Sequence, residues 1–164
     1  MELSSVPTDA ELAAWAMHVA ADVQHHRLLL ATAESCTGGW IAKTLTDLPG
    51  SSAWFDAGVV SYSNDAKISL LGVNGTTLER YGAVSKETVL EMVSGALDRF
   101  GAGLAIAVTG IAGPTGGTPD KPVGTVWIGW QRRGASARAK LVHFHGDREA
   151  VRRQTVAMAT TASI

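Results

Sequence analysis

Ser35 is a candidate nucleophile because of the segment in which it lies. Residues 33–39 read Ala-Glu-Ser-Cys-Thr-Gly-Gly and follow a short apolar run, as expected where a buried strand turns into a helix. Open α/β sheets bind ligands at the carboxyl ends of their strands, and a serine on such a turn can expose its hydroxyl. The alternative is that Ser35 or Thr37 only caps the following helix, and this segment alone does not decide between the two.

The same turn offers hydrogen-bond donors for a developing negative charge. The amides of Thr37, Gly38 and Gly39 would lie at the start of the helix, where free N–H groups can hold an oxyanion or a phosphate. Cys36 is the rival nucleophile, because a thiolate is intrinsically more reactive than an alkoxide. No histidine in the sequence is obviously placed to deprotonate it, so we favour Ser35.

A base for Ser35 is offered by the segment after the second predicted strand. Residues 62–67 read Tyr-Ser-Asn-Asp-Ala-Lys, and both Tyr62 and Lys67 could face a cleft at the same sheet edge. A lysine can accept a proton when desolvation or a nearby cation lowers its pKa. The alternative is an exposed Lys67, which is the ordinary position of lysine and the interpretation favoured by this segment alone. In that case Glu34 is the next candidate base.

A glycine-rich loop follows the third predicted strand. It runs from Thr109 to Gly117 and continues to Lys121, so it is rich in backbone donors suited to phosphate or ribose. It has neither the spacing of a P-loop nor that of a dinucleotide-binding fingerprint. The alternative is a flexible surface loop, but three such loops at strand ends indicate one shared site.

The elements that must position these loops follow from the apolar periodicity. Helices are predicted over 8–24, 38–48, 64–71, 85–100 and 147–162, and strands over 28–33, 54–62, 104–108, 123–130 and 137–144. The order α-β-α-β-α-α-β-β-β-α predicts an α/β fold, a three-layer α/β/α sandwich with a mixed, mostly parallel sheet. A length of 164 residues predicts a single domain over 1–164.

Composition excludes several classes of protein. With 46% hydrophobic and 18% charged residues the chain can bury a core, and a net charge of -1 argues against a nucleic-acid binder. No apolar run is long enough to span a membrane, and residues 1–10 do not resemble a secretion signal. The single cysteine excludes an intrachain disulfide and fits a cytoplasmic protein. Five tryptophans leave room for an aromatic patch at which two copies could form a dimer.

The histidines do not predict a metal site. His143 and His145 would share one face of a strand, a geometry found in some metal centres. Without a carboxylate or cysteine partner nearby, the polar face of an edge strand is the favoured interpretation. We therefore expect no metal and no cofactor.

In combination the motifs are those of a known family. Residues 33–39, 62–64, 108–114 and 121–126 closely resemble the C-terminal domain family of the competence/damage-inducible protein CinA, in order and in spacing. The likeness extends from about the first strand to the last helix. It implies hydrolysis of nicotinamide mononucleotide to nicotinic acid mononucleotide and ammonia, with a small-molecule nucleotide as the partner.

The resemblance also implies roles for single residues. Ser35 would be the nucleophile, Lys67 its base, and Tyr62 a relay or donor of protons. The oxyanion and the nucleotide would be held by polar and backbone groups of one set of residues: Thr37, Gly38, Gly39, Asn64, Thr109, Gly110, Ala112, Gly113, Gly116, Gly117 and Lys121. The alternative function is a non-catalytic nucleotide-binding or competence-related regulatory domain, which would not need the pair Ser35 and Lys67.

Overall fold

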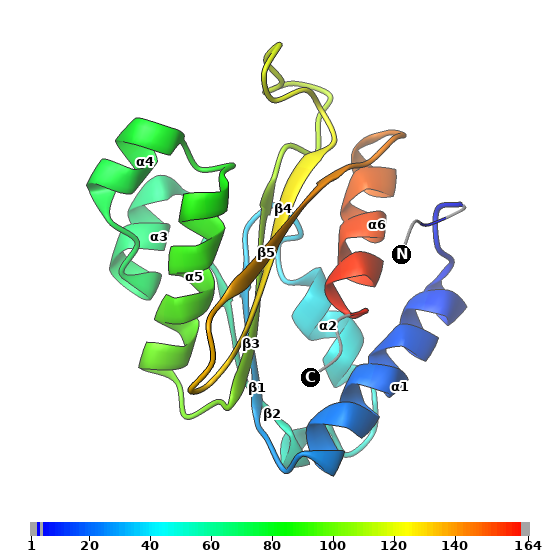
Figure 1. The fold of residues 1–164 in the computed structure, drawn as a ribbon. Coiled ribbons are helices and arrows are strands. Elements are labelled where there is room, and N and C mark those ends of the chain that lie inside the picture. The colour runs from blue at the N-terminus through cyan, green and yellow to red at the C-terminus, as the bar shows by residue number, and fades with distance from the viewer. Residues whose placement is uncertain (1–2, 4, 162–164) are drawn as a thin grey trace.

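A single mixed sheet forms the middle of the molecule (Figure 1). The computed structural model describes residue 3 and residues 5–161. The strands are β1 (Leu30–Glu34), β2 (Phe55–Val60), β3 (Leu104–Gly110), β4 (Thr125–Arg132) and β5 (Arg138–His143), in the order β2-β1-β3-β4-β5. Strand β1 pairs in parallel with β2 and β3, whereas the β3–β4 and β4–β5 pairings are antiparallel. Only β4 is reversed, so the sheet is mixed and mostly parallel, as predicted.

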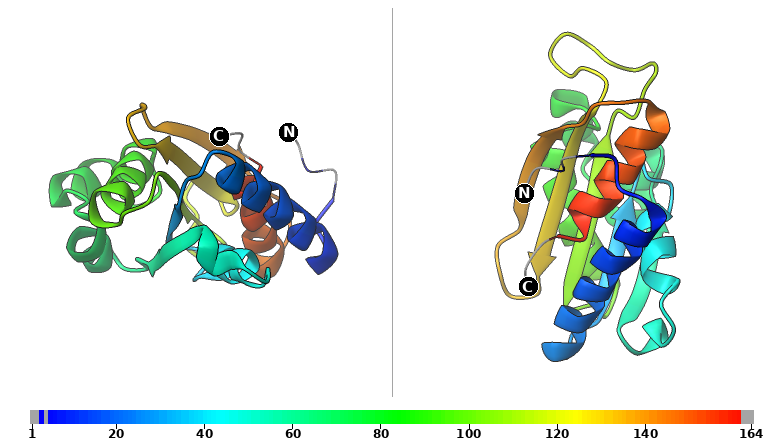
Figure 2. Two further views of the ribbon diagram at one scale, coloured as in Figure 1. Left: turned by 90° about the horizontal axis from the view of Figure 1, so that it is seen from below. Right: turned by 90° about the vertical axis from the view of Figure 1, so that its right-hand side faces the viewer.

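Helices cover both faces of the sheet and complete three layers (Figures 1 and 2). Helices α1 (Asp9–His25), α2 (Trp40–Thr46) and α6 (Arg148–Ala159) lie on one face. Helices α3 (Asn64–Leu71), α4 (Gly75–Tyr81) and α5 (Lys86–Arg99) lie on the other. The predicted three-layer α/β/α sandwich is therefore confirmed.

Strands β1 and β3 are buried on both faces, but the side chains on the two faces differ in size. On the face covered by α1, α2 and α6 they present large side chains, namely those of Leu30, Leu104, Ile106 and Val108. On the face covered by α3, α4 and α5 their apolar side chains are all alanines: Ala31, Ala33, Ala105 and Ala107. Small side chains let a helix approach the sheet closely, so α5 packs directly against β1 and β3.

Gly95 of α5 allows α3 to approach α5 closely. A Cβ atom at this position would lie 1.8 Å from the backbone oxygen of Leu71, at the end of α3. No heavy atoms approach so closely without displacing one another. The absence of a side chain at Gly95 therefore fixes the distance between the two helices, and α3 carries Lys67.

The structure differs from the predicted elements mainly at their ends. Helix α2 begins at Trp40 rather than at residue 38, because the preceding residues form a turn with Gly38 and Gly39 at positive φ. Strand β2 ends at Val60 rather than at residue 62, which frees the chain for the turn into α3. Helix α4 was not predicted at all. The predicted end of the last helix at residue 162 lies outside the described residues.

Candidate active site

A pocket of about 250 Å³ lies where β1 and β3 end and α6 begins. Strands β1, β2 and β3 are parallel, so the segments that follow them meet at one edge of the sheet. The pocket wall is made by residues from these segments, from the loop before α5 and from α6: Ser35, Cys36, Tyr62, Lys67, Ala83, Val84, Thr109, Gly110, Ile111, Ala112, Gly113, Thr115, Gly116 and Arg148. Segments more than one hundred residues apart thus share one site.

Lys67 lies against Ser35 in this pocket. Its Nζ atom is 3.0 Å from Ser35 Oγ, and the lysine is 1% exposed. The position follows from the turn after β2, where Ser63 caps α3 by accepting a hydrogen bond from the amide of Ala66. Lys67 is therefore in the first turns of α3, from which its side chain reaches back under the end of the strand. The structure brings together the two residues that the sequence singled out.

The surroundings of Lys67 shift its protonation equilibrium toward the neutral form. Burial lowers the pKa of its ammonium group below the ordinary value of 10.5. Its other two partners are the carbonyl oxygens of Ser61, at 2.9 Å, and Tyr62, at 3.0 Å. Carbonyls can only accept, so Lys67 donates to both of them, and in the neutral amine the remaining lone pair faces the Ser35 hydroxyl. Among the described residues no carboxylate pairs with Lys67 to hold the proton.

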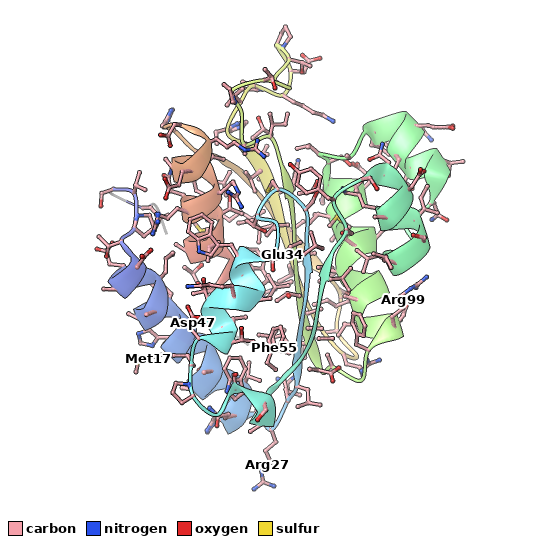
Figure 3. The ribbon with its side chains drawn as sticks, turned by 180° about the vertical axis from the view of Figure 1, so that it is seen from behind. Met17, Arg27, Glu34, Asp47, Phe55 and Arg99 are labelled. Atoms are coloured by element: carbon pink, nitrogen blue, oxygen red, sulfur yellow. The ribbon has the colours of Figure 1, made fainter. Side chains whose placement is uncertain are left out.

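Glu34 holds the turn that carries Ser35 (Figure 3). Its carboxylate is 1% exposed and accepts hydrogen bonds from Thr37 Oγ1 at 2.6 Å, the Ile41 amide at 2.8 Å and the Ala42 amide at 3.0 Å. Burial raises the pKa of Glu34, while these hydrogen bonds oppose the rise. Glu34 thus occupies the N-terminus of α2 from inside the protein, and its carboxylate has no hydrogen bond to Ser35.

This arrangement corrects the expected oxyanion donors. The amide of Gly38 donates to the Ser35 carbonyl at 3.0 Å, and the amide of Gly39 is directed to the Glu34 carboxylate. Neither amide is therefore free for a substrate. The amides of Cys36 and Thr37 donate no hydrogen bond to another described residue. Of the three predicted amides only that of Thr37 stays a candidate, and the amide of Cys36 joins it.

The glycine-rich loop contributes part of what was predicted. Thr109, Gly110, Ala112, Gly113 and Gly116 line the pocket. The remaining expected binding residues, Asn64, Gly117 and Lys121, do not line it. Lys121 instead donates from Nζ to the Tyr81 carbonyl at 2.7 Å, so it ties the loop to the end of α4.

Tyr62 lies at the pocket, but its phenol is not between the serine and the lysine. The residue is 58% exposed, and its hydroxyl accepts a hydrogen bond from Arg148 Nη2 at 3.1 Å. The Tyr62 carbonyl, not the phenol, contacts Lys67 and lies 3.4 Å from Ser35 Oγ. A relay through the phenol is therefore not supported, because its partner is Arg148.

Two arginines of α6 were missed in the sequence. Arg148 lines the pocket and donates from Nη1 to the Gly113 carbonyl at 2.8 Å. Arg152, one turn later, donates to the Cys36 and Thr37 carbonyls. The two arginines follow the helix cap Asp147 and are four residues apart, which places them on one helix face. Their spacing in the helix was the only local sign that they could act together. They are too far from Ser35 in the sequence to form a recognisable motif with it.

Cys36 is poorly suited to act as the nucleophile. The thiol is 6% exposed, and burial raises its pKa to about 12, with the neighbouring Glu34 carboxylate acting in the same direction. A thiol with such a pKa is almost fully protonated near neutral pH and is weakly nucleophilic.

Within the described ranges, 3 and 5–161, no three histidine, cysteine, aspartate or glutamate side chains form a group that could hold a metal ion. In the same part of the chain, no helix is long and apolar enough to cross a membrane. His143 lies on the edge strand β5, with Nδ1 at 3.4 Å from Thr125 Oγ1.

Comparisons with known proteins identify the family of the chain. Residues 12–162 match the family model of the CinA C-terminal domain. The nicotinamide-nucleotide amidohydrolase PncC of Escherichia coli K12 is 47% identical over 152 residues, which cover 93% of this chain and 92% of the relative. A protein of the same name from Pseudomonas putida is 57% identical over 125 residues, covering 76% and 78%.

Solved structures show the same fold. The competence/damage inducible protein CihA from Agrobacterium tumefaciens superposes with a TM-score of 0.89 at 43% sequence identity. The match covers 98% of this chain and 95% of that one. A CinA superfamily protein from Klebsiella pneumoniae gives a TM-score of 0.87 at 41% identity, covering 91% and 92%.

Proposed function

The chain belongs to the CinA C-terminal domain family, and from this premise we propose that it hydrolyses the carboxamide of nicotinamide mononucleotide, with Ser35 as nucleophile and Lys67 as base. Its relatives named as nicotinamide-nucleotide amidohydrolases support amidase activity on this class of substrate. The single observation that carries the mechanism is the 3.0 Å contact between Lys67 Nζ and Ser35 Oγ inside a pocket.

The first half of the reaction transfers the acyl group to Ser35. Neutral Lys67 removes the hydroxyl proton as Ser35 Oγ attacks the carboxamide carbon, which produces an ammonium on Lys67 and a tetrahedral oxyanion. The carbon–nitrogen bond then breaks, and Lys67 returns the proton to the departing nitrogen as ammonia leaves. An ester between Ser35 and the nicotinate group remains.

The second half repeats these steps with water. Lys67 takes a proton from a water molecule that attacks the ester, and the new tetrahedral intermediate expels Ser35 Oγ, which recovers its proton. The net reaction consumes one amide and one water and gives one carboxylic acid and one ammonia. Lys67 carries the proton in each half of the reaction, and both Lys67 and Ser35 return to their starting protonation states.

The oxyanion of both intermediates would be held by the amides of Cys36 and Thr37. The residue after a nucleophile on a strand-to-helix turn commonly supplies such a donor. Neither amide donates a hydrogen bond to another described residue, and the Cys36 amide has only the thiol of its own residue as a partner, so both can donate to the oxyanion at little cost in existing hydrogen bonds.

The nucleotide would lie along the glycine-rich loop and Arg148. The pyridinium ring carries a positive charge, which disfavours the ammonium form of Lys67 and so assists the burial effect. The 5′-phosphate is the natural partner for the Arg148 guanidinium, which lines the same pocket.

The alternative is a nucleotide-binding domain without catalysis, which the competence-related names of several relatives would suit. Such a domain has no use for a desolvated lysine, since burying an ammonium without a counter-ion costs stability. The placement of Lys67 against Ser35 thus favours the enzyme.

Ammonia release from nicotinamide mononucleotide tests the proposal. Ser35→Ala removes the nucleophile, so we expect kcat to fall by several orders of magnitude while the thermal midpoint stays close to that of the wild type. Cys36→Ala is the matched control on the adjacent residue and should keep kcat within about threefold, since its thiol has no role in the reaction. Substantial turnover by the Ser35 variant together with loss in the Cys36 variant would transfer the nucleophile to Cys36.

A further inference from the structure

Two consecutive arginines of α6 lie beside α2, but their contacts differ. The guanidinium of Arg152 is 5.4 Å from the centre of the Trp40 ring and that of Arg153 is 4.9 Å from it. Arg153 pairs with Asp9 and Glu149 at the surface. Arg152 instead reaches the nucleophile turn, so the two residues share an environment and differ in what they hold.

Arg152 binds two successive carbonyls of that turn. Its Nε donates to the Cys36 carbonyl at 3.1 Å, and its Nη2 donates to the Thr37 carbonyl at 3.2 Å. Within the part of the chain that the structure describes, no carboxylate pairs with Arg152. Its positive charge therefore acts on the peptide groups of the turn.

These bonds determine where the adjacent N–H group points. In a trans peptide the N–H lies opposite the C=O, so a guanidinium on the Cys36 carbonyl directs the Thr37 amide to the other side. The Gly38 amide holds the Ser35 carbonyl and orients the Cys36 amide in the same manner. A cation at the carbonyl also polarises the peptide and strengthens its N–H as a donor.

We propose that Arg152 is a positioning residue for the oxyanion site: it holds the peptide between Cys36 and Thr37 so that the Thr37 amide faces the reacting carbonyl. The proposal rests on the proposed function, because it assigns a role within that reaction. Glu34 holds the same turn from the opposite end through Thr37 Oγ1 and the α2 amides. Two side chains thus hold the turn: the Glu34 carboxylate accepts from its N–H and O–H groups, and the Arg152 guanidinium donates to its carbonyls.

The test compares Arg152→Ala with Arg153→Ala. Both changes remove a guanidinium from Trp40, but only the first frees the turn. For Arg152→Ala we expect kcat on nicotinamide mononucleotide to fall about 10- to 100-fold with KM within about threefold, since the lost interaction acts in the transition state. Arg153→Ala should keep kcat within about twofold, because its partners are exposed ion pairs.

Two further measurements separate positioning from general loss of structure. Free guanidinium, below the concentration that unfolds the wild type, should restore part of the kcat of Arg152→Ala and none of any other variant's loss. Arg152→Lys should stay impaired, because an ammonium cannot bridge two carbonyls as the planar guanidinium does. A kcat equal to that of the wild type in Arg152→Ala, or a loss that guanidinium does not reverse, would overturn the proposal.

A reaction without the natural substrate keeps this test independent of the amidase assignment. An alkyl fluorophosphonate modifies a reactive serine through an oxyanion-like transition state, and the rate can be followed by intact-protein mass spectrometry. Slower modification of Ser35 in Arg152→Ala, but not in Arg153→Ala, supports the positioning role even if the wild type releases no ammonia from nicotinamide mononucleotide. Equal modification rates in the two variants contradict it, whatever the substrate.

Discussion

Lys67 is a buried amine whose contacts suit a base rather than an ion pair. Three oxygen atoms surround its Nζ, and two of them are carbonyls that can only accept hydrogen bonds. Burial penalises the ammonium and lowers its pKa from 10.5, which increases the fraction able to accept a proton from Ser35 at a given pH. The same burial makes Lys67 a measurable contributor to pH-dependent stability.

The pH dependence of stability should reveal this shifted lysine. Between the lowered folded pKa and 10.5 the unfolded chain binds more protons at Lys67 than the folded chain does, so the contribution of Lys67 to the free energy of unfolding rises with pH in that window. The buried Cys36 thiol, whose pKa is raised from 9.0 to about 12, contributes in the opposite direction above pH 9.0, so the Lys67 contribution is measured as the difference between the wild type and a Lys67 variant. Below the folded pKa the penalty is complete and constant. Lys67→Met should remove this rise, as seen by urea unfolding of both proteins at pH values from 7 to above 10, and should abolish ammonia release.

Lys43 provides the control, because it is exposed and paired with Asp47, which raises its pKa. Lys43→Met should leave the rise in stability in place and should leave kcat unchanged. The assignment would be contradicted if Lys67→Met kept the same pH slope as the wild type. In the wild type, kcat/KM should increase with pH up to an inflection below 10.5, since the active form of Lys67 is the neutral one.

At the scale of elements, the position of Lys67 depends on how closely α3 approaches α5. Gly95→Ala would place a methyl group 1.8 Å from the Leu71 carbonyl oxygen, so α3 must move away from α5. We expect a loss of about 1–3 kcal/mol in the free energy of unfolding. Because α3 carries Lys67, kcat should also fall under conditions where the variant is fully folded.

Gly101→Ala is the matched control for this prediction, since nothing lies within 4 Å of the methyl group that it adds after the same helix. It should change neither kcat nor the urea midpoint appreciably. A Gly95→Ala variant with wild-type kcat would mean that the position of α3 does not limit the contact between Lys67 and Ser35.

Most of the elements could be predicted from periodicity and capping, but Lys67 was paired with Ser35 only through the family resemblance, since its own segment favoured an exposed lysine. Parallel strands place their carboxyl ends together, so the segments after β1 and β2 were expected to share one edge of the sheet. Helix α4 was missed because Gly75, Thr76 and Thr77 at its start are weak helix formers, and packing against α5 stabilises it instead.

The rest of the site could not be predicted, because it depends on long-range contacts. Arg152 meets Cys36 across more than one hundred residues of chain, and no local pattern specifies which helix face turns toward the sheet edge. Glu34 was considered a possible base from its place beside Ser35. Its actual partners are the α2 amides, and only the direction of its side chain decides between the two roles.

At the scale of the whole molecule, the pocket differs in charge from the chain as a whole. The chain has a net charge of -1, yet the pocket wall contains the Arg148 guanidinium and the Lys67 amine and no acidic side chain. The sheet order brings β1 and β3 side by side, and α6 borders the pocket from the face of the sheet that it shares with α1 and α2. A small neutral substrate would gain little from this arrangement, whereas a ligand with a phosphate at one end would gain a charge-assisted hydrogen bond.

Recognition of the substrate should therefore depend on its phosphate through Arg148. One charge-assisted hydrogen bond contributes about 1.5–3 kcal/mol, so nicotinamide riboside should show a kcat/KM at least about 10- to 100-fold below that of the mononucleotide. Arg148→Met should lower kcat/KM for the mononucleotide by a similar factor and change that for the riboside by less than about threefold. Arg153→Met, on the same helix but outside the pocket, should preserve the difference between the two substrates. Equal losses on both substrates in Arg148→Met would show instead that the guanidinium supports the loop through the Gly113 carbonyl and does not bind phosphate.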